Sequence, residues 1–166
     1  MQQPTVVHGQ FTVEREYPVP PERVFAAHAT ADAKISWFAV PDHEFIDEIE
    51  EFTLDFRVGG MERLVARLAN GGQMILETRY WDIVPNERIV ATYDVVIRGR
   101  RLSVSLWSVQ LYPTAEGTKL VTVEDGAFLD DLDAADQRRK GVTYDYENLA
   151  TYLERTPATA GANTLR

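Results

Sequence analysis

The chain has 166 residues, of which 45% are hydrophobic and 26% are charged, and this length and composition fit one globular domain. Its formal net charge of −9 repels phosphate backbones and anionic lipid surfaces, so a general nucleic-acid binder is disfavoured. The chain contains no cysteine, which excludes disulfides and cysteine-based zinc sites, and it has no apolar run of bilayer or signal-peptide length, so we expect a soluble cytoplasmic protein without membrane insertion.

The middle of the chain shows no internal repeat, low-complexity block or linker, so residues 11–155 are predicted to form a single domain. Residues 1–10 lack periodicity. Residues 156–166 are small and polar and are interrupted by Gly and Pro. We expect flexible tails at both ends.

The first predicted element is a strand over residues 11–17, where apolar and polar side chains alternate. Prolines at positions 18, 20 and 21 end this strand. Because proline is tolerated in the first turn of a helix, a short helix is predicted to follow. Thr30 is the expected N-cap of a second short helix, which ends before Pro41.

A period of two then continues from residue 49 to residue 128, which predicts a meander of strands. Gly59-Gly60 and Asn70-Gly71-Gly72 contain residue types that adopt positive φ at low cost, so each is predicted to be a hairpin turn. Together with the first strand, seven strands are expected, over residues 11–17, 49–57, 61–69, 73–84, 89–98, 101–112 and 118–128.

A period of 3.6 returns after residue 131, where Val142, Tyr146, Leu149 and Leu153 lie on one face of a predicted helix over residues 132–154. Gly141 is expected to kink or divide this helix. The order of elements predicts an α+β fold in which the helix covers the apolar face of an antiparallel sheet. An apolar pocket is expected between the sheet and the helix.

Several segments resemble a known family in their order and spacing: VEREYPVPPERVFAA, DFRVGG followed by MERLV, YWDIVPNERIVATYDV, TKLVTVEDGAF and GVTYDYENLATYLE. The chain resembles the START-like superfamily, also called SRPBCC, Bet v 1-like or helix-grip, in the branch named after the activator of the heat-shock-protein ATPase. The resemblance covers about residues 11–154. It implies a seven-stranded curved antiparallel sheet wrapped on a long C-terminal helix over a cavity, with two short helices after the first strand.

The sequence departs from this family at one position of the last helix. Members commonly have tryptophan after the glycine that opens the helix, whereas Gly141 is followed here by Val142, with larger side chains at Tyr144 and Tyr146. We expect this difference to change the shape of the cavity. The family name implies only weakly that a chaperone is a partner, because the eukaryotic co-chaperone has an additional domain for chaperone binding.

The candidate site residues are those expected to lie on the faces of the sheet and helix that border the pocket. On the strand over residues 73–84, Glu77 and Arg79 are expected to share a polar stripe, in which Arg79 either joins a cross-strand ion pair or anchors a ligand carboxylate. Only one residue of the Glu124-Asp125 pair can face inward. The residues expected to line the ligand site are Glu77, Arg79, Trp81, Tyr93, Trp107, Glu124, Val142, Tyr146 and Leu149.

Other kinds of site find no support in the sequence. His8, His28 and His43 lack the spacing of metal ligands, so no metal is expected. The serines lack a GxSxG elbow, and the glycine pairs lie in hairpin turns rather than in a phosphate-binding loop. We expect no cofactor.

Three functions remain open. The first is non-enzymatic binding or carriage of a small hydrophobic molecule in the cavity. The second is catalysis on the same fold, as in a cyclase or aromatase acting on a polyketide-like substrate. The third is an interaction module that modulates a chaperone ATPase, with a role in the stress response. The first is favoured, and a homodimer or a chaperone contact stays open as a further partnership.

Overall fold

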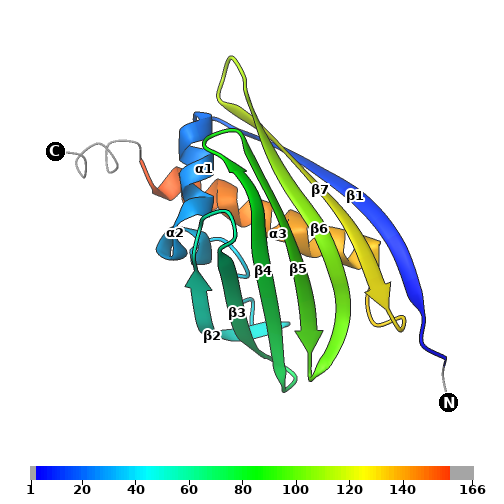
Figure 1. The fold of residues 1–166 in the computed structure, drawn as a ribbon. Coiled ribbons are helices and arrows are strands. Elements are labelled where there is room, and N and C mark those ends of the chain that lie inside the picture. The colour runs from blue at the N-terminus through cyan, green and yellow to red at the C-terminus, as the bar shows by residue number, and fades with distance from the viewer. Residues whose placement is uncertain (1–2, 158–166) are drawn as a thin grey trace.

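The computed structural model describes residues 3–157 and shows an α+β fold built on one seven-stranded antiparallel sheet, in the order β1-β7-β6-β5-β4-β3-β2 (Figure 1). The strands are β1 (Val6–Tyr17), β2 (Ile46–Leu54), β3 (Met61–Leu68), β4 (Gln73–Val84), β5 (Arg88–Ile97), β6 (Arg100–Pro113) and β7 (Thr118–Leu129). The helices are α1 (Pro21–Ala29), α2 (Ala31–Ile35) and α3 (Ala135–Arg155). This architecture confirms the predicted fold class. None of the described helices is long and apolar enough to cross a lipid bilayer.

Strand β1 begins at Val6, five residues before the predicted start, and pairs with β7 from Val6↔Leu129 to Tyr17↔Thr118. Residues 6–10 therefore belong to the sheet and not to a flexible tail. Their alternation is broken at Gly9, where a Cβ atom would lie 2.7 Å from the Cβ of Ala135. Because α3 approaches this strand closely, a glycine stands at an inward-facing position. The alternation of apolar and polar side chains is not visible there, so the sequence does not show that the strand starts earlier. Of the predicted C-terminal tail, residues 158–166 lie outside the described residues.

The two short helices connect β1 to β2 and lie at one end of the sheet (Figure 1). Pro21 is the first residue of α1, and Thr30 caps α2 by accepting a hydrogen bond from the backbone N–H of Ala33 at 3.3 Å. Both features agree with the prediction. Arg23 of α1 donates to the backbone carbonyl of Leu153 at 3.1 Å, which ties α1 to the C-terminal end of α3.

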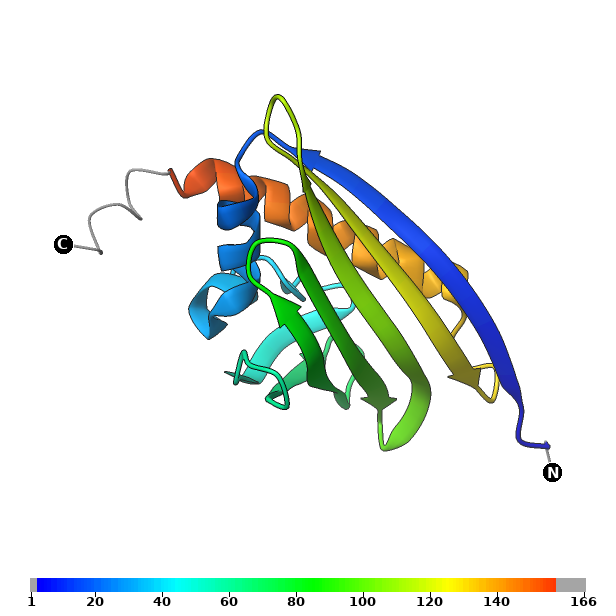
Figure 2. The ribbon, with the colours of Figure 1, turned by 45° about the horizontal axis from the view of Figure 1, so that its top comes forward.

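Helix α3 runs unbroken along the concave face of the sheet, and Figure 2 shows it next to β7 and β1. It begins at Ala135, three residues after the predicted start, and the kink expected at Gly141 is absent from the described helix. Tyr146, Leu149 and Leu153 are buried in one core cluster with Tyr17 of β1. The predicted apolar face of α3 is therefore the face that packs on the sheet.

Truncation of the buried side chain at position 149 tests this packing. Leu149 has no exposed surface, so Leu149→Ala should lower the free energy of unfolding by about 2 to 5 kcal/mol, as expected for a cavity left in a core. Thr151→Ala on the exposed face of the same helix is the control. Chemical denaturation measures both variants, and a similar small loss in each would show that Leu149 contributes little to the core.

The turn before β3 provides a second test, because its two glycines are required for different reasons. Gly59 has φ of +83° with open space around its Cβ position, whereas a Cβ on Gly60 would lie 2.0 Å from the backbone oxygen of Asp55. Gly59→Ala should cost about 1 to 2 kcal/mol. Gly60→Ala should cost at least about 1 kcal/mol more, because the backbone must move. Equal losses in parallel denaturation curves would contradict this distinction.

Candidate functional site

A cavity of about 940 Å³ lies between the concave face of the sheet, the segment from α2 to β2 and the N-terminal half of α3. Its volume is at the upper end of the range usual for small-molecule sites. The sheet contributes an apolar wall formed by Met74, Leu76, Val95, Ile97 and Leu102. Aromatic side chains continue this wall, namely Trp37, Phe38, Tyr93, Trp107 and Tyr146.

A first polar group on the cavity wall is centred on Arg138 of α3, and we call it the Arg138 cluster. Arg138 donates to the Tyr93 hydroxyl at 2.8 Å, to Ser103 Oγ at 2.6 Å and to Asp133 Oδ2 at 2.7 Å. It also forms an ion pair with Glu124 at 3.3 Å, and Tyr93 donates to the second oxygen of Glu124 at 2.5 Å. Desolvation raises the pKa of Glu124, although Arg138 opposes this shift.

A second polar group, the Lys34 cluster, consists of Lys34, Glu62 and Tyr80, which are 4%, 2% and 1% exposed. Lys34 Nζ lies 2.6 Å from Glu62 Oε2 and donates to the Tyr80 hydroxyl at 3.3 Å, while that hydroxyl donates to Glu62. The ammonium also lies over the rings of Phe38 and Trp107, at 4.9 and 5.5 Å from their centroids. The buried charges of this cluster therefore neutralise one another.

Asp145 of α3 is a third polar feature of the wall. Its Oδ1 accepts a hydrogen bond from the backbone N–H of Ala39 at 3.0 Å, which ties α3 to the segment after α2. Desolvation raises the pKa of Asp145 to about 7, against the lowering effects of the Ala39 hydrogen bond and of the Lys34 charge. Among the described residues, no Lys, Arg or His side chain forms an ion pair with it.

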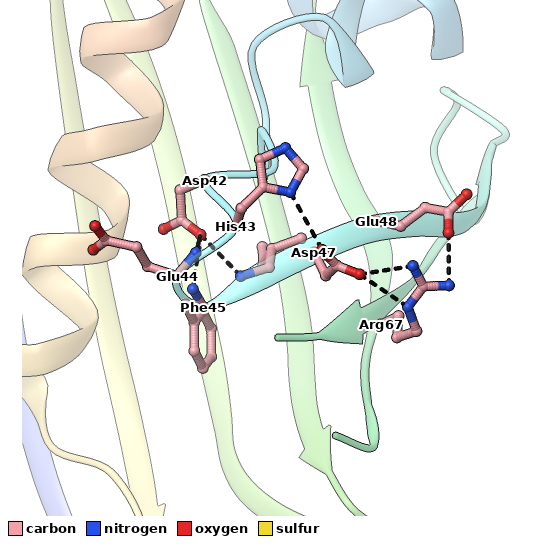
Figure 3. A network of polar contacts seen from close by, with 8 residues as sticks. Asp42, His43, Glu44, Phe45, Asp47, Glu48 and Arg67 are labelled. Atoms are coloured by element: carbon pink, nitrogen blue, oxygen red, sulfur yellow. Dashed lines mark hydrogen bonds and ion pairs between the residues drawn. The ribbon is translucent and has the colours of Figure 1, made fainter. Parts of the chain in front are cut away.

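The rim of the cavity includes the loop that leads into β2, shown in Figure 3. Asp42 Oδ1 accepts hydrogen bonds from the backbone N–H groups of Glu44, Phe45 and Ile46 at 3.0, 2.8 and 3.0 Å. Desolvation acts to raise the pKa of Asp42, but these hydrogen bonds dominate and lower it. The carboxylate thus fixes the loop that presents Phe45, which is 48% exposed, at the rim.

A network of exposed ion pairs lies beside this loop, at the start of β2 (Figure 3). Asp47 accepts hydrogen bonds from Arg67 at 2.7 Å and is 3.2 Å from His43 Nδ1, and Arg67 also pairs with Glu48. The hydrogen bond from Arg67 is the largest cause of a lowered pKa at Asp47. Because these groups are solvated, we assign the network to the surface between β2 and β3 and not to the cavity.

Five of the residues predicted from the sequence line the cavity: Tyr93, Trp107, Glu124, Val142 and Tyr146. Leu149 does not line it, because it lies fully buried in the core beneath the C-terminal half of α3. That any of these residues contacts a ligand stays a prediction. Of the Glu124-Asp125 pair in the middle of β7, Glu124 faces inward and Asp125 is exposed, where it accepts a hydrogen bond from Gln10.

The prediction was wrong for Glu77, Arg79 and Trp81, which lie on the outer face of β4. The Arg79 guanidinium stacks on the Trp81 ring at 4.4 Å, and Trp81 donates to Thr92 Oγ1 at 2.8 Å. Residues 74, 76, 78 and 80 face inward instead. Apolar side chains occur at both odd-numbered and even-numbered positions of β4, so the alternation alone did not identify which positions face the inside of the sheet.

Four ionisable residues of the cavity wall were not predicted from the sequence: Lys34 and Glu62, which are buried, and Arg138 and Asp145, which are partly buried. A signal existed only for Glu62, since it has the same phase as the buried residues Leu64, Ala66 and Leu68 of β3. The remaining three lie on helical segments whose polar side chains are usually exposed. Within residues 3–157, no group of three or more His, Asp or Glu side chains has an arrangement that could hold a metal ion.

Comparison with known proteins shows the family to which the chain belongs. Residues 18–154 match the family model described as Activator of Hsp90 ATPase homolog 1-like protein. A solved structure from Rhizobium leguminosarum is similar, with 33% identity, a TM-score of 0.87 and coverage of 93% of this chain and 100% of that one. One from Rhizobium loti has 39% identity, a TM-score of 0.81 and coverage of 90% and 99%. One from Chromobacterium violaceum has 26% identity, a TM-score of 0.70 and coverage of 87% and 96%. No curated protein matches the chain.

The raised pKa of Asp145 predicts a specific dependence of stability on pH. In the unfolded chain this carboxyl ionises near its ordinary pKa of 3.8, whereas the folded protein retains the proton up to about pH 7. Ionisation therefore destabilises the fold progressively as the pH rises between these values. Asp145→Asn should match the wild type near pH 4 and exceed it at pH 8, by on the order of 2 to 4 kcal/mol.

Urea denaturation of the wild type and of Asp145→Asn at several pH values measures this difference. Glu147→Gln, an exposed carboxyl on the same helix, is the matched control and should differ little from the wild type at any pH. A constant difference between Asp145→Asn and the wild type from pH 4 to pH 8 would show that Asp145 titrates normally.

Proposed function

This chain belongs to the family of Activator of Hsp90 ATPase homolog 1-like proteins, within the START-like superfamily, and we propose that it binds a small, largely hydrophobic molecule. The proposed site is the cavity between the sheet and α3. The observation that supports this function is the combination of a volume of about 940 Å³ with a wall of aliphatic and aromatic side chains. Entry of an apolar molecule into such a space is favourable, because it removes apolar surface from contact with water.

The polar groups of the wall support binding rather than turnover. The charged groups of the Arg138 cluster and of the Lys34 cluster are engaged with other members of the same cluster, which keeps each side chain in one position. A ligand that enters between the two clusters meets an apolar surface with fixed polar groups at its edges. This arrangement provides shape selection and orientation without a free nucleophile.

Catalysis of the cyclase or aromatase type is a second candidate, favoured by the Lys34 cluster. Glu62, which lines the cavity, accepts a hydrogen bond from the Tyr80 hydroxyl next to a buried ammonium, so its carboxylate is a group able to exchange a proton with a bound substrate. Native mass spectrometry separates the two functions. A co-purified molecule that keeps its mass during incubation supports carriage, whereas a mass change that depends on Glu62 supports catalysis.

The third alternative, a module that acts on a chaperone or on another protein, would use the surface. The outer face of the sheet exposes Trp81, Val104 and Leu106, which are 51%, 47% and 48% accessible. Binding of a partner there would be unaffected by a molecule in the cavity. Absence of any saturable cavity ligand would favour this alternative.

A substitution that fills the cavity tests the proposed function. Titration of the wild type with the neutral fluorescent probe N-phenylnaphthylamine should show one saturable site. Val142→Trp places a large ring against the cavity and should weaken the probe at least about tenfold by occupying its space. The readout is the probe fluorescence, with circular dichroism to confirm the fold.

Leu106→Trp is the control, because it adds similar bulk on the outer face of β6, where Leu106 is 48% exposed. Its affinity for the probe should equal that of the wild type. Titrations that never saturate, or equal weakening by both substitutions, would rule out the cavity as the binding site.

A further inference from the structure

We propose that the ligand of this cavity carries a basic nitrogen, and that Asp145 pairs with its ammonium group. This inference rests on the proposed function and specifies the chemical class of the ligand. It follows from the balance of charges on the cavity wall, which differs from the balance expected for a carrier of fatty acids or other carboxylates.

The two buried cations of the wall have no charge left to offer an anionic ligand. Lys34 is paired with Glu62 at 2.6 Å, so the Lys34 cluster is neutral. Arg138 is paired with both Glu124 and Asp133, at 3.3 and 2.7 Å, so the Arg138 cluster has one more carboxyl than cations. A ligand carboxylate would have to displace one of these partners and leave a buried charge unpaired.

The remaining ionisable groups make the wall acidic. In total, three cationic side chains and six carboxyl groups line the cavity. Besides the two clusters, these are Asp145 inside, Asp42 and Asp131 at the rim, and the exposed Lys140. Solvent screens Lys140, whereas the carboxyl groups at the rim attract a cation toward the entrance. The net charge of −9 acts in the same direction over longer distances.

Asp145 is the group that such a cation would meet. Asp145 lines the cavity and is partly exposed, and its Oδ1 accepts the Ala39 N–H at 3.0 Å. No other hydrogen bond to this carboxyl occurs among the described residues, so the second oxygen is available to a ligand. The ring of Tyr144, which is 38% exposed, also lines the cavity and suits an organic ammonium, since cations are attracted to aromatic faces.

The pKa of about 7 at Asp145 is consistent with this assignment. Desolvation disfavours the ionised carboxyl at this position of the wall, and an ammonium at hydrogen-bond distance would supply a counter-charge. A charge-assisted hydrogen bond of this kind is stronger than one between neutral groups.

The test uses three competitors with the same ten-carbon chain and different head groups: decylamine, decanol and decanoate. Each displaces N-phenylnaphthylamine from the wild type at pH 8, below its micellar concentration. We expect decylamine to bind about tenfold more tightly than decanol, and decanoate to bind most weakly. Asp145→Asn should remove the advantage of decylamine over decanol while the affinities for decanol and for the probe stay within about twofold.

Glu147→Gln is the matched control, since it removes one carboxyl from the exposed side of the same helix and should retain the full preference for decylamine. If Asp145→Asn does not fold, Asp145→Ser provides the same comparison with a smaller neutral side chain. Decanoate binding as tightly as decylamine would overturn the proposal, as would an unchanged amine preference in the Asp145 variants. Failure of the probe itself to bind would instead overturn the proposed function.

Discussion

A single helix cannot cover a seven-stranded sheet, and this mismatch determines the rest of the structure. Six strand spacings of about 4.8 Å make the sheet roughly 29 Å wide, whereas a helix with its side chains is about 10 to 12 Å across. Helix α3 packs along β1 and buries the core beneath its C-terminal half. The short helices cover part of the remainder, and the cavity occupies what is left of the concave face.

The buried charges follow from the same geometry. Where α3 and α2 stand away from the sheet, their polar side chains face the cavity, where contact with water is reduced, so a charge there is stabilised by a partner inside the protein. Arg138 reaches across to Glu124 on β7, and Lys34 reaches across to Glu62 on β3. These pairs fasten helices to strands on the cavity wall. Asp145 is the exception, because it has a backbone N–H as its partner and no cation.

Much of the fold was predictable from the sequence, but only part of the site. Alternation and turn glycines predicted all seven strands, and the spacing from Tyr146 to Leu153 predicted the buried face of α3. On β4, however, both phases contain apolar residues, so Trp81 was assigned to the wrong face. Lys34 and Arg138 were missed because a buried charge is recognisable only when its partner, distant in sequence, is known.

The most direct test of an open, ligand-binding cavity is a methyl NMR titration of the folded protein with N-phenylnaphthylamine, since the methyl groups of the cavity wall and of the outer face can be observed separately. Binding in the cavity predicts saturable shifts at Leu76, Val95, Leu102 and Val142, which line it, and unchanged signals at Val104 and Leu106 on the outer face. Saturable shifts confined to Val104 and Leu106, or none at any of these methyl groups, would contradict it.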